Sequence, residues 1–381
     1  MKVLHIVRAL DVGGLERVVL DLVEGGRSLG IESHIACLYH AGTWGKGRPD
    51  LTVLGGRSKV VKSIKLARLV RHLGVTVLHS HNPEPHSVAV LTRLLTGVPV
   101  VNTKHGRNCP ERWKWRLQNI WLNRCSAKIV AVSKDIEAVA LGPEQTPRGK
   151  VCLIHNGIDV GRFESRAEGV ERRVSPVESH PPSDLRPPAS DLRLLTIGTV
   201  GRLRHEKNYM MFVRAFSLLR ERLSHDSHPF FSCRLLFVGD GPERNALEEE
   251  ASRVGVTSQC VFAGNQSNVA EWLGMMDIFC LSSLTEGTSI TLLEACAAGL
   301  PAVVTDVGGN GEIVQDRHSG FLVPEGDENA FAEKLKILVT DAGLRVRMGE
   351  NAHAWVKARY SLEAMVSAYV RVYGESVGGC I

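Results

Sequence analysis

Two carboxylates flank a helix start in the segment 281–295, LSSLTEGTSITLLEA. Glu286 ends the loop that follows an apolar run, and Glu294 falls about a turn and a half inside the expected helix. Between them lie residues that suit a helix N-terminus with free N–H groups and capping hydroxyls: Gly287, Thr288 and Ser289. Such an N-terminus can hold a phosphate, and a carboxylate can accept hydrogen bonds from vicinal sugar hydroxyls. Glu294 stands among apolar residues, where a carboxylate needs a partner.

Two cations follow another apolar run, in the segment 201–208, GRLRHEKN. Open parallel sheets bind ligands in the loops after their strands, so Gly201, Arg202 and Lys207 stand where a ligand is expected. Arg can fork onto phosphate oxygens, whereas Lys acts as a compact point charge. Together the two could neutralise a leaving diphosphate as charge develops on it. A solvated basic loop is the alternative, and it suits Arg204 better than this pair.

A glycine pair, Gly13 and Gly14, follows the first apolar run and opens a helical pattern. Glycine lets a backbone approach a ligand closely, and free N–H groups at a helix start favour an anion. A tight turn without a ligand explains the pair equally well. The segment lacks the GxGxxG spacing, which argues against a dinucleotide cofactor.

Short apolar runs alternate with amphipathic stretches through both halves of the chain, a pattern that predicts parallel sheets covered on both faces. The strands expected in the first half are 3–7, 34–38, 75–79, 98–103, 128–132 and 151–155. Those expected in the second half are 192–200, 234–238, 259–263, 278–282 and 302–305. Helices are expected at 207–223, 242–254, 267–275, 289–298, 327–339, 341–358 and 362–373.

The composition is that of a globular protein of two α/β domains, since 381 residues exceed an ordinary single domain. The segment 165–191 has five prolines and little to bury, so we expect a flexible linker or insertion there.

A net charge of +5 is too small for a dedicated nucleic-acid binder. Nine cysteines without a CxxC pair are typical of small buried residues in a reducing compartment, and none suggests a zinc site. The start resembles a strand more than a signal peptide, and no apolar run could span a membrane, so a cytoplasmic protein is expected.

The spacing of Glu286 and Glu294 is that of the E-x7-E motif, and the chain resembles the retaining GT-B glycosyltransferases of family 4. The resemblance covers nearly the whole length outside 165–191. Its other segments are GGLER (13–17), His105-Gly106, VSKDI (132–136), HNGID (155–159), GRLRHEKN (201–208), VGDGPER (238–244) and AAGLPAVVTDVGGNGEIV (297–314). It implies an α/β GT-B fold, in which two Rossmann-like domains face a central cleft. The implied divisions are an acceptor domain at 1–164, the linker 165–191, a nucleotide-sugar domain at 192–358, and a final helix at 359–381 that packs back on the first domain.

The resemblance also implies roles for individual residues. Arg202 and Lys207 would bind the donor diphosphate, Glu294 the ribose hydroxyls and Glu286 the donor sugar. His105 would face the transferred sugar. The expected catalytic residues are thus His105, Glu286, Arg202 and Lys207. The remaining donor-binding positions are the backbone of Gly287, Thr288 and Ser289, the loop at Gly201, the first-domain Gly14, and a nucleobase site at Gly239 and from Phe262 to Gly264.

The implied reaction needs no metal and no cofactor, because the basic pair and the helix N-terminus supply the positive charge. Many relatives have a second glycine and a proline after the first Glu, whereas this chain has Thr288 and Ser289 near the sugar. The donor sugar therefore stays open, as does the choice among UDP-, GDP- and ADP-linked donors. The acceptor is expected to be a sugar, a glycan or a lipid-linked molecule in polysaccharide or glycolipid biosynthesis.

A basic stretch at 104–128 interleaves tryptophans with cations, as in helices that lie on an anionic membrane surface. Packing of these tryptophans into the first domain is the alternative, and nucleic acid is not an expected partner.

Two other kinds of protein remain open for the whole chain. One is a GT-B relative with another activity, a nucleotide-sugar epimerase or a phosphorylase. The other is a non-catalytic nucleotide-sugar-binding protein, which the presence of both Glu, the Arg and the Lys disfavours.

Overall fold

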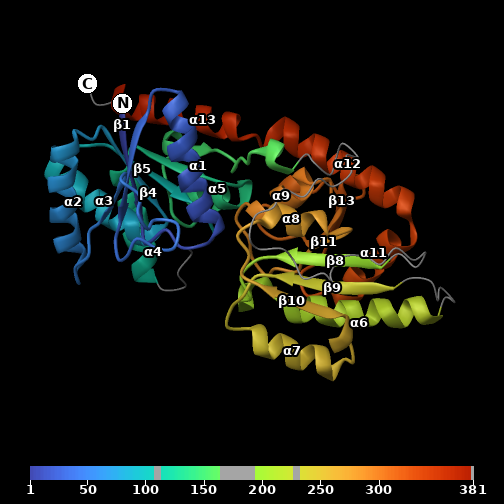
Figure 1. Ribbon diagram of the computed structural model, residues 1–381. Helices are drawn as coiled ribbons and strands as arrows, with labels where there is room; N and C mark the ends of the chain where they lie inside the picture. Colours follow the sequence, from blue (N-terminus) through green and yellow to red (C-terminus); the bar gives the residue numbers. More distant parts are fainter. Residues whose placement is uncertain (107–112, 164–193, 226–231, 379–381) are drawn as a thin grey trace. The chain divides into compact units, whose positions relative to one another are not determined.

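The computed structural model describes residues 1–106, 113–163, 194–225 and 232–378, which form two compact units (Figure 1). Unit 1 consists of Met1–Ile158 together with Tyr360–Ile381, and unit 2 of Asp159–Arg359. The expected linker 165–191 lies outside the described residues. No helix in the described ranges has both the length and the apolar character needed to cross a bilayer.

Unit 1 contains a seven-stranded parallel sheet in the order β3-β2-β1-β4-β5-β6-β7. Its strands are β1 (Lys2–Val7), β2 (Glu32–Cys37), β3 (Leu51–Val53), β4 (Val77–His81), β5 (Val100–Lys104), β6 (Lys128–Ala131) and β7 (Val151–Leu153). Its helices are α1 (Gly14–Ser28), α2 (Lys59–Leu73), α3 (Pro83–Thr96), α4 (Trp113–Cys125), α5 (Lys134–Leu141) and α13 (Leu362–Gly378).

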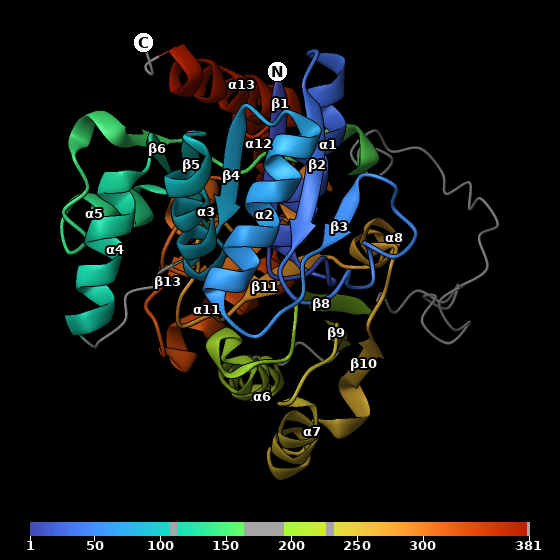
Figure 2. The same cartoon turned by 90° about the vertical axis from the view of Figure 1, so that its left-hand side faces the viewer.

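The two faces of this sheet follow from the alternation of side chains along β1. Leu4 and Ile6 point to the face covered by α2 and α3, which lie in front of the sheet in Figure 2. Val7 points to the opposite face, where it packs with Val19 and Val23 of α1. The last helix, α13, lies beside α1 and contacts β4 and β5, so the C-terminal segment completes the cover of this face (Figure 1).

Strand β4 lies two residues later than the range 75–79 expected from the sequence. Val75 is still part of the helix end, since Gly74 adopts a left-handed conformation and Val75 N–H donates to the Val70 carbonyl. The strand therefore includes His79, Ser80 and His81, whose side chains are all buried. The expected strand ended at His79 because the next residues are polar, and the burial of Ser80 and His81 in the sheet is the reason that this boundary was wrong.

Unit 2 contains a six-stranded parallel sheet in the order β10-β9-β8-β11-β12-β13. Its strands are β8 (Leu195–Val200), β9 (Cys233–Val238), β10 (Cys260–Gly264), β11 (Ile278–Leu281), β12 (Ala302–Thr305) and β13 (Gly320–Val323). Its helices are α6 (Tyr209–His225), α7 (Arg244–Arg253), α8 (Val269–Gly274), α9 (Ile290–Ala297), α10 (Asn310–Ile313), α11 (Glu328–Thr340) and α12 (Ala342–Arg359). Apart from β4, the expected strands and the helices expected from residue 207 onward agree with the structure to within a few residues. The strands β3 and β13 and the four-residue α10 were missed, and no ranges were predicted for α2, α3 and α5 of unit 1.

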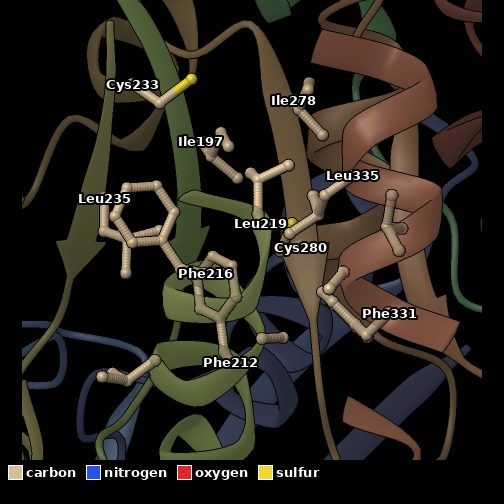
Figure 3. Close-up of a cluster of buried hydrophobic side chains, with 14 of the residues drawn as sticks. Ile197, Phe212, Phe216, Leu219, Cys233, Leu235, Ile278, Cys280, Phe331 and Leu335 are labelled. Carbon is tan, nitrogen blue, oxygen red and sulfur yellow. The ribbon is translucent and has the colours of Figure 1, made fainter. Parts of the chain in front are cut away.

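The core of unit 2 forms where α6 and α11 pack on one face of the sheet (Figure 3). Phe212 and Phe216 of α6 lie one turn apart and point toward Ile197 of β8 and Leu235 of β9. Phe331 of α11 closes the same cluster, and its ring centroid lies 6.0 Å from that of Phe212. This packing holds the strands whose following loops carry most of the predicted site residues.

A buried ion pair fixes β5 of unit 1 to the segment after α5. The Lys104 ammonium lies 2.6 Å from the Glu144 carboxylate, and both side chains are more than nine-tenths buried. Asn119 and Asn123 of α4 each donate an amide hydrogen bond of 3.0 Å to the same carboxylate. The carboxylate therefore connects β5 to α4, and Lys104 is the residue directly before His105.

Replacement of Glu144 by Gln is expected to lower the free energy of unfolding of unit 1 by about 3–5 kcal/mol, because it leaves the Lys104 ammonium buried without its counterion. Urea unfolding followed by circular dichroism measures the change. The control is Glu137→Gln, which removes a partner 3.5 Å from the largely exposed Arg148 and should cost less than about 1 kcal/mol. Equal losses in both variants would contradict this account.

Candidate functional site

The basic loop after β8 is held in shape by its own backbone. Leu203 is fully buried, and its N–H donates to the Asp240 carbonyl at 3.0 Å. A short 3-10 turn, His205–Lys207, follows, and Asn208 adopts a left-handed conformation with φ of 48° before α6 begins. The turn and the reversal at Asn208 fix the direction in which the Lys207 side chain leaves the backbone.

The Lys207 ammonium bonds to the Glu286 carboxylate, with 2.5 Å between Nζ and Oε1. The Ser283 hydroxyl donates to the same oxygen at 2.6 Å. Burial lowers the pKa of Lys207, but the neighbouring Glu286 carboxylate, together with Tyr209 and Glu206, raises it, and the net pKa lies above its ordinary value. The structure thus brings together two of the predicted catalytic residues from loops that lie 79 positions apart.

Hydrogen bonds to backbone carbonyls connect these two loops around the ion pair. The Ser282 hydroxyl donates to the carbonyls of Lys207 and Asn208, each at 3.0 Å. Leu284 N–H donates to the Glu206 carbonyl at 2.9 Å. The loop after β8 and the loop after β11 are therefore one hydrogen-bonded assembly, a consequence of their strands being neighbours in the sheet.

A third loop, after β12, approaches Glu286 so closely that it requires glycine. Gly308 has φ of +55°, and a Cβ there would lie 1.9 Å from the Glu286 carbonyl oxygen. Gly309 N–H donates to the Gly287 carbonyl at 2.8 Å. These contacts of Gly308, Gly309, Ser282 and Ser283 were not expected from the sequence, although the glycine pair within the TDVGGN segment was a usable signal.

Helix α9 begins where the sequence predicted. Ser289 is its N-cap, and its hydroxyl accepts a hydrogen bond from Leu292 N–H. Gly287 and Thr288, like Ser289, are buried, whereas Glu286 and Glu294 are half-buried. The predicted order of carboxylate, helix start and second carboxylate on the helix is therefore present in the fold.

The glycines predicted for the nucleobase region bring three backbone segments into contact. Gly239 N–H donates to the Gly264 carbonyl at 2.8 Å, and a Cβ on Gly239 would lie 2.0 Å from the Gly201 carbonyl oxygen. Gly239 has φ of 141°, so two separate constraints require glycine there. Phe262 is half-buried and stacks on Phe237, with ring centroids 4.9 Å apart and planes 10° apart.

Arg202 is exposed and makes no ion pair or hydrogen bond within the described part of the chain. Its neighbour Arg204, in contrast, lies 3.8 Å from Glu206. Arg202 and Lys207 therefore have no hydrogen-bonding or ion-pair partner in common among the described residues. Its guanidinium keeps all of its donors available for an anion.

Two predicted site residues belong to unit 1. Gly14 is the exposed first residue of α1, after an N-cap residue, Gly13, that offers no side chain. His105 follows β5, is half-buried, and bonds through Nε2 to Nδ1 of His81 at 3.0 Å. Burial lowers the pKa of His105 to about 3, so its imidazole is neutral at physiological pH.

Known protein families match both units. The family of glycosyl transferases group 1 matches residues 184–355, and Glycosyltransferase Family 4 matches residues 12–162. Among curated relatives, the putative glycosyltransferase EpsD of Bacillus subtilis is 27% identical over 81% of this chain and 79% of its own length. An Escherichia coli UDP-Gal:alpha-D-GlcNAc-diphosphoundecaprenol alpha-1,3-galactosyltransferase is 24% identical over 82% of this chain and 79% of its own length.

Solved structures share the fold over almost the whole chain. A glycosyltransferase from Rickettsia africae matches with a TM-score of 0.80 and 20% identity, over 99% of this chain and 98% of that one. Anabaena HepE in complex with UDP-glucose matches with a TM-score of 0.80 and 18% identity, over 98% of this chain and 99% of that one. These neighbours have the GT-B fold, which confirms the fold expected from the motifs.

Replacement of Glu286 by Gln should lower the pKa of Lys207, because burial of the ammonium would no longer be opposed by the adjacent carboxylate. Competitive labelling of lysine amines at increasing pH, read by mass spectrometry, measures this pKa. Glu206→Gln is the control, since Glu206 also raises the Lys207 pKa but with a smaller influence. An unchanged or higher Lys207 pKa in the Glu286 variant would show that the ion pair does not govern this lysine.

Proposed function

Because the chain belongs to the family 4 glycosyltransferases of the GT-B fold, we propose that it is a retaining enzyme that transfers a sugar from a nucleotide-sugar donor. The proposed acceptor is a sugar, a glycan or a lipid-linked molecule, and the proposed setting is polysaccharide or glycolipid biosynthesis. The observation that carries the proposal is the Lys207–Glu286 pair, which lies beside the start of α9 in one hydrogen-bonded assembly of loops.

Charge supports the assignment of the diphosphate to this assembly. When the bond between the sugar and the phosphate breaks, the leaving diphosphate gains negative charge. Lys207 supplies a fixed cation, and Arg202 supplies a guanidinium that no described protein group occupies. The N-terminal N–H groups of α9 add positive potential from the same side of the sheet.

In the proposed reaction, the acceptor hydroxyl attacks the anomeric carbon on the face from which the diphosphate departs. The bond to the phosphate oxygen breaks, the new glycosidic bond forms, and the acceptor proton passes to the leaving phosphate oxygen. The configuration is thereby retained. We propose that this route needs no metal, because the cations and N–H groups named above supply the charge.

The donor is proposed to be a uridine nucleotide-sugar, with GDP- and ADP-sugars as the other candidates. The similar Anabaena HepE was solved in complex with UDP-glucose, and the similar Escherichia coli enzyme is a galactosyltransferase that uses UDP-Gal, which supports the choice of uridine. The proposed nucleobase contact is the half-buried Phe262 with the glycine backbone at Gly239 and Gly264. Glu294 is proposed to accept hydrogen bonds from the ribose hydroxyls, and Glu286 from the donor sugar.

A panel of UDP-, GDP- and ADP-sugars should give one nucleotide that binds clearly more tightly than the others in calorimetry. Arg202→Ala should weaken this binding, because it removes a diphosphate contact. Lys207→Ala should lower the transfer rate about 10²–10³-fold, as expected when one charge-stabilising donor is lost. Arg204→Ala, which removes an exposed cation of the same loop, should stay close to wild type.

The outcomes separate the remaining alternatives. Near-wild-type transfer by Lys207→Ala would contradict the assignment of Lys207 to the diphosphate. Donor binding without transfer to any acceptor would favour a non-catalytic nucleotide-sugar-binding protein. Epimerised donor or phosphorolysis of a glycan would indicate the other activities known for this fold.

Helix α4 supports a second proposal, that unit 1 contacts an anionic membrane surface. Trp113, Leu117 and Trp121 are spaced four residues apart, so they form one stripe, and their exposed fractions are 66%, 54% and 46%. Trp115 is also exposed, so these tryptophans do not pack into the core of the domain, which was the alternative expected from the sequence. The cations on the same helix, Lys114, Arg116 and Arg124, would lie near lipid phosphates.

We expect the protein to float with vesicles that contain an anionic phospholipid and to be released as the salt concentration rises. The double variant Trp113→Ala/Trp121→Ala should lose most of this binding, because it removes two apolar anchors from the stripe. The control is Val346→Ala, which removes an exposed apolar side chain on α12 of unit 2. Equal flotation of the double variant and the wild type would rule out α4 as the contact.

A further inference from the structure

Four histidines gather on the face of the unit 1 sheet that α13 covers. His5 of β1 pairs in register with His79 of β4, and His81 lies two residues further along β4, so all three point to the same face. His105 follows β5, whose Thr103 is the register partner of His81. Only His105 was expected from the sequence to belong to a site, because the other three histidines become its neighbours only in the folded sheet.

Three of these histidines are hydrogen-bonded in series. His5 Nδ1 lies 3.3 Å from His81 Nε2, and His81 Nδ1 lies 3.0 Å from His105 Nε2. The backbone N–H of His105 donates to Asn82 Oδ1 at 3.2 Å, which fixes the loop at the end of the series. His81 uses both ring nitrogens, so its ring can only rotate if both bonds break.

Each imidazole in the series is neutral at physiological pH. Burial lowers the pKa of His5 to about 3, and burial together with the neighbouring histidines holds the pKa of His81 well below its ordinary value. Burial alone lowers the pKa of His105 to about 3. A neutral imidazole has one N–H donor and one acceptor nitrogen, so the three rings carry three protons between them.

Three neutral rings in series can keep both hydrogen bonds in only two ways. In the first, each ring has its proton on Nδ1, so that His5 donates to His81 and His81 donates to His105. In the second, each ring has its proton on Nε2 and both bonds run in the opposite direction. The two arrangements give the outer nitrogen of the series, His105 Nδ1, opposite roles as donor or acceptor.

The inner end of the series favours the first arrangement. Among the described residues, no group bonds to Nε2 of His5, and this side chain is only 1% exposed. The second arrangement would bury an N–H there without an acceptor, which folded proteins avoid more strongly than an acceptor without a donor. The first arrangement leaves His5 Nε2 as an acceptor and makes His105 Nδ1–H a donor.

We propose that His5 and His81 are positioning residues that hold His105 with its proton on Nδ1, so that this nitrogen donates a hydrogen bond to a hydroxyl of the transferred sugar. The consequence for transfer rests on the proposed function. The tautomer itself depends only on the hydrogen bonds within unit 1. Within the described chain no protein group bonds to His105 Nδ1, so this donor is available to a ligand.

A metal site is the alternative explanation of the cluster, because nitrogens of His5, His79 and His81 lie within 4.8 Å of one another. His79 argues against it. Its Nε2 bonds to the Thr103 hydroxyl at 2.7 Å and its Nδ1 to the Tyr373 hydroxyl at 2.8 Å. A histidine whose two nitrogens both have protein partners offers no lone pair to a metal.

The remaining members of the cluster hold the series in place. The His79 ring centroid lies 4.1 Å from that of His81, so the two rings pack directly against each other. Tyr369 of α13 bonds to the Thr103 hydroxyl at 3.1 Å. Tyr369 and Tyr373 thus place two hydroxyl groups of α13 over the histidine cluster, so α13 contributes hydrogen bonds as well as apolar packing.

Nitrogen-15 NMR of the labelled protein reports which ring nitrogen of His105 carries the proton. We expect the Nδ1–H tautomer in the wild type and, in His81→Phe and His5→Phe, a shift toward the Nε2–H tautomer that imidazole favours in water. His81→Asn, whose amide can replace the Nδ1 donor, should restore the wild-type tautomer. His86→Gln is the control, because His86 is an equally buried histidine that bonds to Ser126 outside the series.

Transfer should fall about 10–100-fold in the two Phe variants, as expected for a misplaced reacting group, with nucleotide binding unchanged. The proposal is overturned if His105 has the Nε2–H tautomer in the wild type, or if its tautomer is the same in all variants. Stoichiometric zinc in the purified protein, lost in His5→Phe, would overturn it in favour of a metal site. If the wild type transfers no sugar, the proposed function fails, while the tautomer measurement still decides the positioning claim.

Discussion

The Lys207–Glu286 ion pair is the interaction on which the arrangement of the candidate site depends. It joins a loop after β8 to a loop after β11, and the hydroxyls of Ser282 and Ser283 bond to the same two loops. A partly buried charge needs a partner, so each member of the pair restricts where the other can lie. The proposed phosphate cation and the proposed sugar-binding carboxylate are thereby held in place without a ligand, so less rearrangement would be needed on binding.

Close backbone contact is the second constraint on this site. Gly239 lies against Gly201, and Gly308 lies against Glu286, each at a distance that no side chain would permit. These contacts bring the ends of strands β8, β9 and β12 together with the loop after β11. These close approaches of the backbone explain why glycines are frequent in the sequence segments of the site.

Local segments of the site could be predicted from the sequence, and its long-range contacts could not. The start of α9 at Ser289 was predictable because capping depends on neighbouring residues. The short edge strand β3 was missed because three residues give too little periodicity. The histidine series was missed because His5, His81 and His105 come from β1, from β4 and from the residue after β5, which are far apart in the sequence. The burial of His5 and His81 also reverses the usual preference of polar residues for the surface. The exposure of Trp113 and Trp121 likewise depends on which side of α4 packs against α3.

The central claim is that the loops after β8 and β11 form a single preorganised nucleotide-diphosphate site. Hydrogen–deuterium exchange of the protein with and without saturating UDP, GDP or ADP tests it most directly. The account predicts that one of these nucleotides slows exchange in 201–208 and in 286–294 together. Slower exchange in only one of the two segments, or slower exchange confined to regions outside both, would contradict it.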